Sequence, residues 1–361
     1  PPHPPPPYSP PQVVSAFRCA VHYGDEDTAP GEDDAQFTFT SGHVFNELMQ
    51  YCLGKLDGVF RRHVAGDAAG GALAKKRGGL DRPDQWPHWR KHQAAVKSYL
   101  TQLVLFLDKL TEPAMMLVVL QQIHRLLPYA LVFPKLCPKL LRALLRAWGV
   151  ESGQAGCLLA FASIRTLAAE LPAPFAQHAF KGLYLTFARN CRTPNRKSLA
   201  RVLLMSSCVV DACGADAPMA YQHGFIYIRQ LAILLRKALQ HRDEQSCRAV
   251  YNWQFVNCLR LWAQVLCAHG REPKAPLRQL LYPLVQICLG ASRLLPNIRF
   301  APLRFQLVRT LNRLSVELGV FIPVAPLLLE AFGFAQLGRP PASHAKERAM
   351  DWSTLVKVTP P

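Results

Sequence analysis

Acidic residues are scarce in this 361-residue chain, in which 24 Asp and Glu stand against 42 Lys and Arg. The resulting formal charge of +18 favours an acidic partner: nucleic acid, an anionic membrane surface or an acidic protein. Charged residues make up 18% of the chain and hydrophobic residues 50%, which excludes a wholly disordered protein and allows a large core.

Long apolar runs are also missing. No uninterrupted stretch reaches the roughly 18 residues that span a bilayer. The best candidate, residues 115–133, is broken by glutamines, a histidine, an arginine and a proline. We therefore expect neither a membrane-spanning helix nor a membrane partner.

The cysteines lack the spacing of disulfide or zinc sites. The chain has 11 of them, an odd number, and no CxxC pair. Most lie within apolar periodic runs, which is typical of buried, reduced thiols in an intracellular protein. Cys208, Cys213 and His223 come nearest to a zinc ligand set, but their spacing is poor, and His88 and His92 have no third ligand nearby. We predict no metal site.

Catalytic motifs are absent from the sequence. There is no GxxxxGK[ST], GxGxxG, GxSxG or HExxH pattern, and no pair of titratable residues is singled out as acid and base. The sequence therefore predicts a protein that is not an enzyme and has no cofactor. An enzyme with an unrecognised site is an alternative, although nothing in the sequence names its residues.

Strand signals are nearly absent, whereas helical periodicity is present almost throughout. From residue 41 onward, amphipathic segments of about 15–25 residues alternate with joints marked by Pro or Gly. Such helices bury their apolar faces by stacking in antiparallel pairs. We predict an all-α fold, an α-solenoid of divergent HEAT/armadillo-like helical repeats, with a compact helical bundle as the alternative.

The predicted organisation has three parts. Residues 1–40 form an extended tail, first Pro-rich and then acidic. Residues 41–335 form the helical-repeat domain, interrupted near 65–85 by a Gly-rich, flexible loop. Residues 336–361 form an extended C-terminal segment.

Positive charge is spread among the helices and their joints. For any one arginine a solvated helix face is the simplest interpretation, but the excess of Arg over acid at several joints favours phosphate contacts. The candidates for contact with RNA phosphate are Arg192, Arg196, Lys197, Arg293, Arg299, Arg304, Arg309 and Arg313. Arg309 and Arg313 are four residues apart and project from one helix face. Aromatic residues mostly fall at core spacing, so base stacking is not indicated.

A stretch of about eighty residues is distinctive beyond its composition. It contains VYNWQFVNCLRLW, LRQLLYPLVQICLGASRLLPNIRFAPLRFQLVRTLNRLS and GVFIPVAPLLLEAF. These segments closely resemble the nucleolar complex protein 2 family, as do FKGLYLTFARNCR and GFIYIRQLAILLRKAL upstream. The matching signature residues include Tyr251, Asn252, Trp253, Tyr282, Pro283, Gly290, Pro302 and Phe305. The resemblance extends from about residue 43 to residue 358. In its closing segment, Trp352 stands at a position where the family pattern has Phe.

The resemblance implies a non-enzymatic assembly factor of the large ribosomal subunit with a HEAT-type solenoid. It implies a protein of the nucleolus and nucleoplasm that associates with pre-60S particles, their proteins and precursor ribosomal RNA. It further implies a part in the export of these particles. It also implies pairing with nucleolar complex protein 1 and, later, nucleolar complex protein 3.

The matched positions also have structural interpretations. The prolines set helix starts and kinks, Gly290 allows close helix packing, and Trp253, Tyr282 and Phe305 belong to the core. Arg293, Arg299 and Arg304 either contact RNA phosphate or cap a neighbouring helix C-terminus. The run Phe321, Ile322, Pro323 and Val324 is a candidate edge for docking a partner, with simple core packing as the alternative.

A second function fits the charge and the fold. A protein-interaction solenoid, acting as a transport or chromatin adaptor, would use the same positive surface to meet acidic protein tails.

Overall fold

The computed structural model describes residues 9–23, 37, 39, 41–65, 82–150, 153–192, 196–333 and 355–357. Over these residues the chain is helical and contains no strand, so the predicted all-α class is confirmed. The solenoid and its HEAT-like repeat type stay a prediction. The chain divides into two compact units, residues 1–182 and 183–361, which we describe separately.

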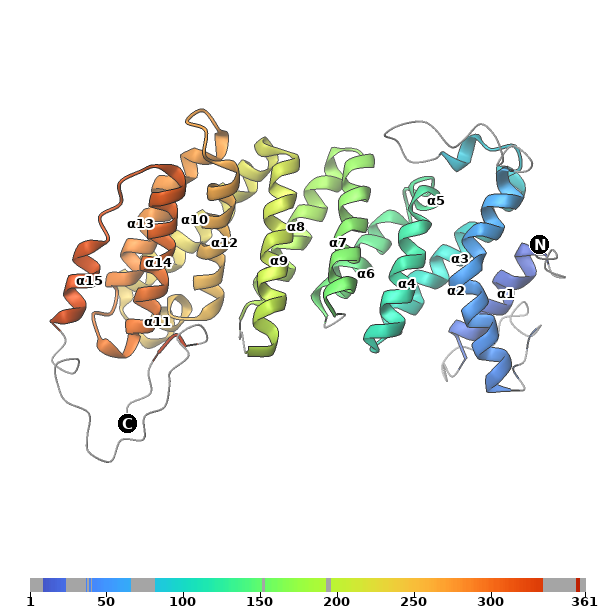
Figure 1. Ribbon diagram of the computed structural model, residues 1–361, viewed down its shortest axis with the longest axis horizontal. Coiled ribbons are helices and arrows are strands. Elements are labelled where there is room, and N and C mark those ends of the chain that lie inside the picture. Colours follow the sequence, from blue (N-terminus) through green and yellow to red (C-terminus); the bar gives the residue numbers. More distant parts are fainter. Residues whose placement is uncertain are drawn as a thin grey trace. The chain divides into compact units, whose positions relative to one another are not determined.

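Unit 1 is built from helices that pack on their neighbours in sequence and on helices two or three elements away (Figure 1). Its elements are α1 (Pro10–Val21), α2 (Gly42–Ala65), η3 (Pro83–Gln85), α3 (Trp89–Lys109), α4 (Pro113–Arg125), α5 (Leu127–Leu131), α6 (Cys137–Gly149), α7 (Gly153–Glu170) and the first half of α8 (Ala173–Asn190). Trp148, Tyr99 and Phe60 are fully buried between them, and the Tyr99 hydroxyl donates to the carbonyl oxygen of Cys52 at 2.6 Å. This bond satisfies the only polar atom of the Tyr99 side chain inside the core.

Helix α1 corrects the predicted tail. Residues 10–21 are helical and packed on α3, whereas we expected residues 1–40 to be extended. Two prolines of the Pro-rich run, Pro10 and Pro11, fall in the first turn of the helix, where a missing N–H costs nothing. Ser9 and Gln12 form a capping box, and Phe17 is fully buried with its ring 5.1 Å from that of Tyr99.

The described residues of unit 2 form the rest of α8 and seven further α-helices. They are α9 (Arg196–Ala215), α10 (Ala217–His241), α11 (Glu244–Val250), α12 (Trp253–His269), α13 (Leu281–Arg293), α14 (Ala301–Leu318) and α15 (Ala325–Phe332), with short turns η4 (Pro276–Leu280) and η5 (Ile298–Phe300). Helix α12 is the centre of this unit, because it contacts α9, α10, α13 and α14. Its Trp262 is fully buried beside the stacked rings of Tyr184 and Tyr227, whose centroids are 3.7 Å apart.

Helix starts and ends follow local chemistry. The side chains of Asp216, Asp243 and Asn252 cap α10, α11 and α12 by accepting from backbone N–H groups in the first turn. Helix α14 ends at Gly319, whose positive φ of 61° favours glycine. Arg278 donates to the carbonyl oxygens of Gly270 and Leu318, so one cation caps the ends of both α12 and α14.

The cysteines are thiols, as predicted. All eleven are free, and ten are buried. Burial raises the pKa of Cys52, Cys213 and Cys288 to about 12, so these thiols stay protonated and unreactive at neutral pH.

One described stretch, Lys197–Ala215 of α9, is long and apolar enough to cross a membrane by length and composition, with a mean hydropathy of 1.4. This is weak evidence, since core helices of soluble proteins have the same properties. Helix α9 packs on α10 and α12, and the Ser206 hydroxyl donates to Gln264 of α12. These contacts bury about a third of the apolar stretch within unit 2.

Several predicted features lie outside the described residues. These are the loop between residues 66 and 81, most of the acidic stretch before residue 41, and nearly all of the C-terminal segment from residue 334.

Candidate nucleic-acid interface

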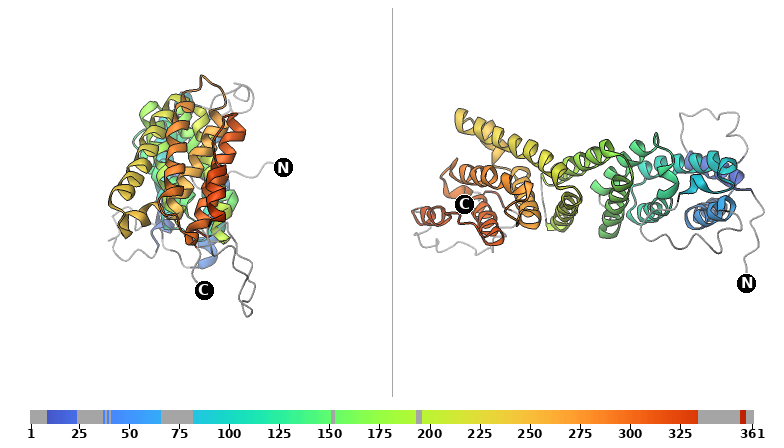
Figure 2. Two further views of the ribbon diagram at one scale, coloured as in Figure 1. Left: turned by 90° about the vertical axis from the view of Figure 1, so that its left-hand side faces the viewer. Right: turned by 90° about the horizontal axis from the view of Figure 1, so that it is seen from above.

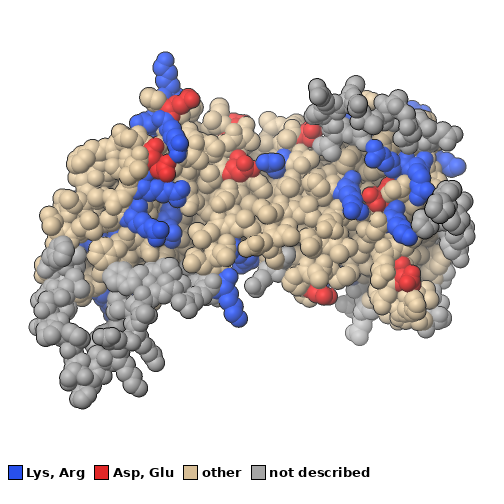
Figure 3. Space-filling model, viewed as in Figure 1, with Lys and Arg blue, Asp and Glu red and all other residues tan. Residues whose placement is uncertain are grey.

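Three arginines meet in a hollow between two helices of unit 2. Arg260 comes from α12, and Arg309 and Arg313 come from α14. The hollow has a volume of about 400 Å³, and Ala263, Gln264 and Thr310 complete its lining. We call these six residues the arginine groove. Figure 3 shows basic side chains gathered on this face of unit 2, where Figure 1 draws α12 and α14.

Helical spacing explains why these side chains converge. Arg260, Ala263 and Gln264 lie at i, i+3 and i+4 on α12, and Arg309 and Arg313 lie at i and i+4 on α14, so each set shares one face. The opposite face of α14 carries Leu307, Leu311 and Leu314, which are fully buried. Packing of the leucines against the core therefore turns the arginines of α14 toward α12.

The charge of the groove is uncompensated. Among the described residues, no carboxylate forms an ion pair with any of the three arginines. Glu317, one turn beyond Arg313, pairs with Arg271 instead. Burial lowers the pKa of Arg260, and the positive charges of Arg309 and Arg313 lower it further. Because arginine keeps its proton in proteins, this mutual repulsion favours binding of an anion.

The neutral lining adds one unused donor group, the amide nitrogen of Gln264. The Gln264 Oε1 atom accepts from the Ser206 hydroxyl, and the Thr310 hydroxyl donates to the carbonyl oxygen of Gln306 at 2.9 Å. The amide nitrogen of Gln264 and three guanidinium groups are then the polar groups that can serve a ligand. A phosphate group carries only acceptors at neutral pH and matches this set.

The other predicted cations do not join the groove. Lys197, Arg293 and Arg299 are exposed, and Arg192 is exposed while donating to Gln254 Oε1 at 3.2 Å. Arg299 precedes α14 and lies ten residues before Arg309, which is roughly 15 Å along a helix. The structure therefore brings Arg309 and Arg313 together with Arg260, and leaves these four cations as separate surface charges. The side chain of Arg196 is outside the described residues.

Arg304 corrects a prediction. Its side chain is buried, 4% exposed, and forms an ion pair with Glu330 of α15 at 3.1 Å. It holds α15 to α14 and does not reach an RNA surface. Its position three residues before Leu307 places it on the apolar stripe of α14, and this spacing could have revealed its burial.

Several signature residues hold the start of α12. The Tyr251 hydroxyl accepts from the N–H of Leu295 at 2.9 Å and donates to the carbonyl oxygen of Ala291 at 3.0 Å. Burial raises the pKa of Tyr251 to about 12, which keeps this hydroxyl a donor at neutral pH. Asn252 caps α12, and Trp253 is buried as predicted. These residues position the helix that carries Arg260.

The remaining signature residues divide between core and surface. Pro302 is buried in the first turn of α14, and Pro283 and Phe305 are half-buried. A Cβ atom at Gly290 would lie 2.8 Å from Leu235 Cδ2, so α13 approaches α10 closely there. Tyr282 is 73% exposed, which contradicts its predicted core position, because it lies on the outward face of α13.

The predicted docking run is also divided. Phe321 is 91% exposed, Pro323 is exposed, and Val324 is intermediate, whereas Ile322 is buried. Ile322 therefore anchors the segment between α14 and α15 to the core, and Phe321 points outward. The run stays a candidate for partner docking through Phe321.

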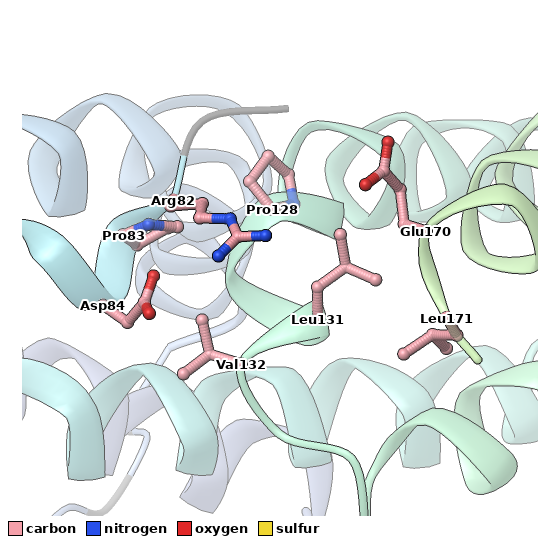
Figure 4. Close-up of a pocket in the computed structure, with 8 residues that line it drawn as sticks. All are labelled: Arg82, Pro83, Asp84, Pro128, Leu131, Val132, Glu170 and Leu171. Atoms are coloured by element: carbon pink, nitrogen blue, oxygen red, sulfur yellow. The ribbon is translucent and has the colours of Figure 1, made fainter. Parts of the chain in front are cut away.

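A second cavity lies in unit 1 and has mixed charge. Figure 4 shows Arg82 and Asp84 on one side, Pro128, Leu131 and Val132 along the middle, and Glu170 on the opposite side. Its volume is about 200 Å³. Two carboxylates against one guanidinium do not favour a phosphate group. No group of three or more metal-ligating side chains occurs among the described residues.

Comparisons with known proteins cover both the groove and its supporting residues. A sequence model of the Noc2p family matches residues 174–361. Nucleolar complex-associated protein 2 of Arabidopsis thaliana is 35% identical over 97% of this chain and 44% of its own length. Nucleolar complex protein 2 of Drosophila melanogaster is 32% identical over 88% of this chain and 41% of its own. An uncharacterised NOC2 family protein of Schizosaccharomyces pombe is 28% identical over 91% and 46%. The chain thus spans less than half the length of these curated relatives.

Proposed function

The chain belongs to the Noc2p family, and from this premise we propose that it is a non-enzymatic scaffold in assembly and export of the large ribosomal subunit. Its relatives are named nucleolar complex proteins, so it is a nuclear protein of the nucleolus with a role in ribosome biogenesis. The proposal adds three finer points: the pre-60S particle as its setting, precursor ribosomal RNA as a ligand, and helical-repeat proteins of the nucleolar complex protein 1 and 3 types as partners.

The arginine groove is the observation that supports the RNA part of the proposal. Its guanidinium groups are charged and form no ion pair with any carboxylate that the structure describes, and that of Arg260 is partly buried. A backbone phosphate bound there would replace mutual repulsion by charge-assisted hydrogen bonds, at about 1.5–3 kcal/mol for each bond. Such contacts hold RNA without reading its bases, as expected of a scaffold that accompanies a folding precursor.

The mechanism is electrostatic and steric. The groove would clamp one stretch of RNA backbone, and exposed cations such as Arg192, Arg293 and Arg299 would extend the contact over the surface of unit 2. A second protein bound elsewhere on the scaffold would then lie at a fixed place relative to that RNA.

Purification of the full-length tagged protein from nuclear extract tests this function. The wild type is compared with a variant in which Arg260, Arg309 and Arg313 are all changed to Gln. Recovery of large-subunit precursor RNA with the wild type, and at least tenfold less with the variant, supports the proposal. Equal recovery with both proteins would contradict the assignment of the groove.

RNase treatment separates the two kinds of partner. Helical-repeat proteins that remain after digestion bind the chain directly. Recovery of acidic proteins without any precursor RNA would favour the transport or chromatin adaptor instead.

A further inference from the structure

Helix α10 presents a second cationic surface, and its setting differs from that of the groove. Phe225, Ile226 and Ile233 are 51%, 49% and 55% exposed. Arg229, Arg236 and Lys237 are exposed on the same side of the helix. We call these six residues the α10 face. Large apolar side chains exposed side by side in this way mark an interaction surface.

The rest of unit 2 packs on the other side of α10. Its buried stripe includes Tyr227, Leu231 and Leu235, and the helix contacts α9, α11, α12 and α13. In the right-hand view of Figure 2, α10, drawn in yellow, runs along the edge of unit 2 with the unit's other helices on one side of it. The α10 face is therefore not used in packing by the described part of the chain.

The pattern of the α10 face specifies a helical ligand. Ile226 and Ile233 are seven residues apart, which places them two turns, about 11 Å, along the helix. Arg229 lies between them, and Arg236 and Lys237 follow one turn later. Apolar layers spaced by two turns and separated by charge are matched by another helix with apolar residues at i and i+7.

The positive charge of the α10 face indicates that the helical ligand is negatively charged. Helix α10 contains no Asp or Glu along its 25 residues. Among the described residues, no carboxylate forms an ion pair with Arg229, Arg236 or Lys237. A partner helix with Asp or Glu between its apolar layers would complement this surface, whereas a basic one would be repelled.

We propose that the α10 face binds an acidic amphipathic helix of a protein partner. The inference rests in part on the proposed function, since the same mixture of apolar and basic residues would also suit an anionic membrane, and the nucleolar location selects a protein. RNA is disfavoured because the exposed apolar side chains would be buried against a charged backbone.

Site-specific photo-cross-linking tests the proposal. In the full-length protein expressed in cells, Phe225 is replaced by p-benzoylphenylalanine, a close match in shape, and adducts are identified by mass spectrometry. The control carries the same replacement at Tyr282, which is also exposed but lies on α13. We expect adducts at position 225 to a segment with net negative charge and apolar residues at helical spacing.

Charge variants make the test specific. Arg229→Glu with Arg236→Glu lowers the adduct yield about tenfold, whereas Lys at both positions retains it, because the attraction depends on charge. The proposal is overturned by adducts mainly to RNA, to lipid, to this chain or a second copy of it, or to a basic segment. A yield at position 225 no higher than at the control also overturns it.

The RNA recovered with the cross-linking protein that carries no charge substitution separates this inference from the proposed function. Absence of the adduct at position 225 in that protein, with precursor RNA recovered, contradicts only the α10 inference. Absence of precursor RNA with the adduct retained contradicts only the RNA part of the function.

Discussion

The arginine groove and the α10 face are both cationic surfaces of unit 2, but their neighbours differ. In the groove, the arginines line a hollow with Gln264 and Thr310, and Arg260 is partly buried. On α10, the cations stand among exposed Phe and Ile side chains. Converging guanidinium groups, one of them partly buried, suit phosphate, whereas cations beside apolar surface suit an acidic amphipathic protein. Sequence charge alone does not distinguish these settings.

The largest expected effect comes from removing the groove. Changing Arg260, Arg309 and Arg313 to Gln is expected to weaken binding of a single-stranded RNA 20-mer about 100-fold at low salt, because charge-assisted bonds to phosphate are lost. The slope of log K against log salt is expected to fall by about 2. Fluorescence anisotropy over a salt series measures both quantities.

A variant with the same change in net charge is the matched control. Lys135, Lys139 and Arg142 are exposed cations of unit 1, and changing all three to Gln also removes three charges. It is expected to weaken RNA binding by less than about threefold. An equal loss of RNA affinity in both variants would show that only the net charge of the protein matters. It would contradict the assignment of RNA phosphate to the arginine groove.

Arg304 provides the next largest effect, on stability and not on binding. Arg304→Ala leaves Glu330 without its partner, at a cost of about 2–3 kcal/mol in unfolding free energy. This is below the range for fully buried pairs because Glu330 is 46% exposed. Urea denaturation followed by circular dichroism measures it. If the salt slope of RNA binding changed while the unfolding free energy did not, Arg304 would be a contact of the RNA after all.

The apolar part of the α10 face has a smaller expected effect. Ile226→Ser with Ile233→Ser is expected to lower recovery of the directly bound protein about tenfold, because both exposed anchors are lost. RNA affinity is expected to stay within about twofold of wild type. Analytical ultracentrifugation should also show less self-association, since exposed apolar surface promotes aggregation. Unchanged partner recovery would contradict the role assigned to this face.

The smallest expected effect distinguishes geometry from charge. Arg309→Lys keeps the positive charge but loses the planar donor fork, so RNA affinity is expected to fall about threefold to fivefold with the salt slope unchanged. The same substitution at Arg229 on α10 is expected to have no measurable effect on partner recovery. Equal sensitivity at the two positions would suggest that both surfaces recognise the same kind of ligand.

Much of the fold could be predicted from periodicity and punctuation. Apolar residues at three- and four-residue spacing give the helices, and Pro113 and Gly149 mark ends of α4 and α6. Composition was misleading for α1, because the prolines at its start are compatible with a first helical turn, and the apolar stripe after them decides the structure.

The site was only partly predictable. Arg309 and Arg313 follow from helical spacing, but Arg260 was missed because it is a single charge in an apolar helix and its partners lie on another helix. That isolation is a signal in itself, since a charge is rarely placed in a core helix without a ligand or ion pair. Tyr282 shows the reverse error, because aromatic character was taken to indicate burial.

Measuring RNA and protein contacts in the same cells tests the central claim, that two cationic surfaces of one unit have different ligands. The full-length protein carries p-benzoylphenylalanine at position 225. Co-purified precursor RNA and the protein adduct at position 225 are quantified in wild type, the groove variant and the Arg229→Glu with Arg236→Glu variant. The account predicts that the groove variant loses RNA and retains the protein adduct, and that the α10 variant does the opposite. Loss of both ligands in each variant would contradict it.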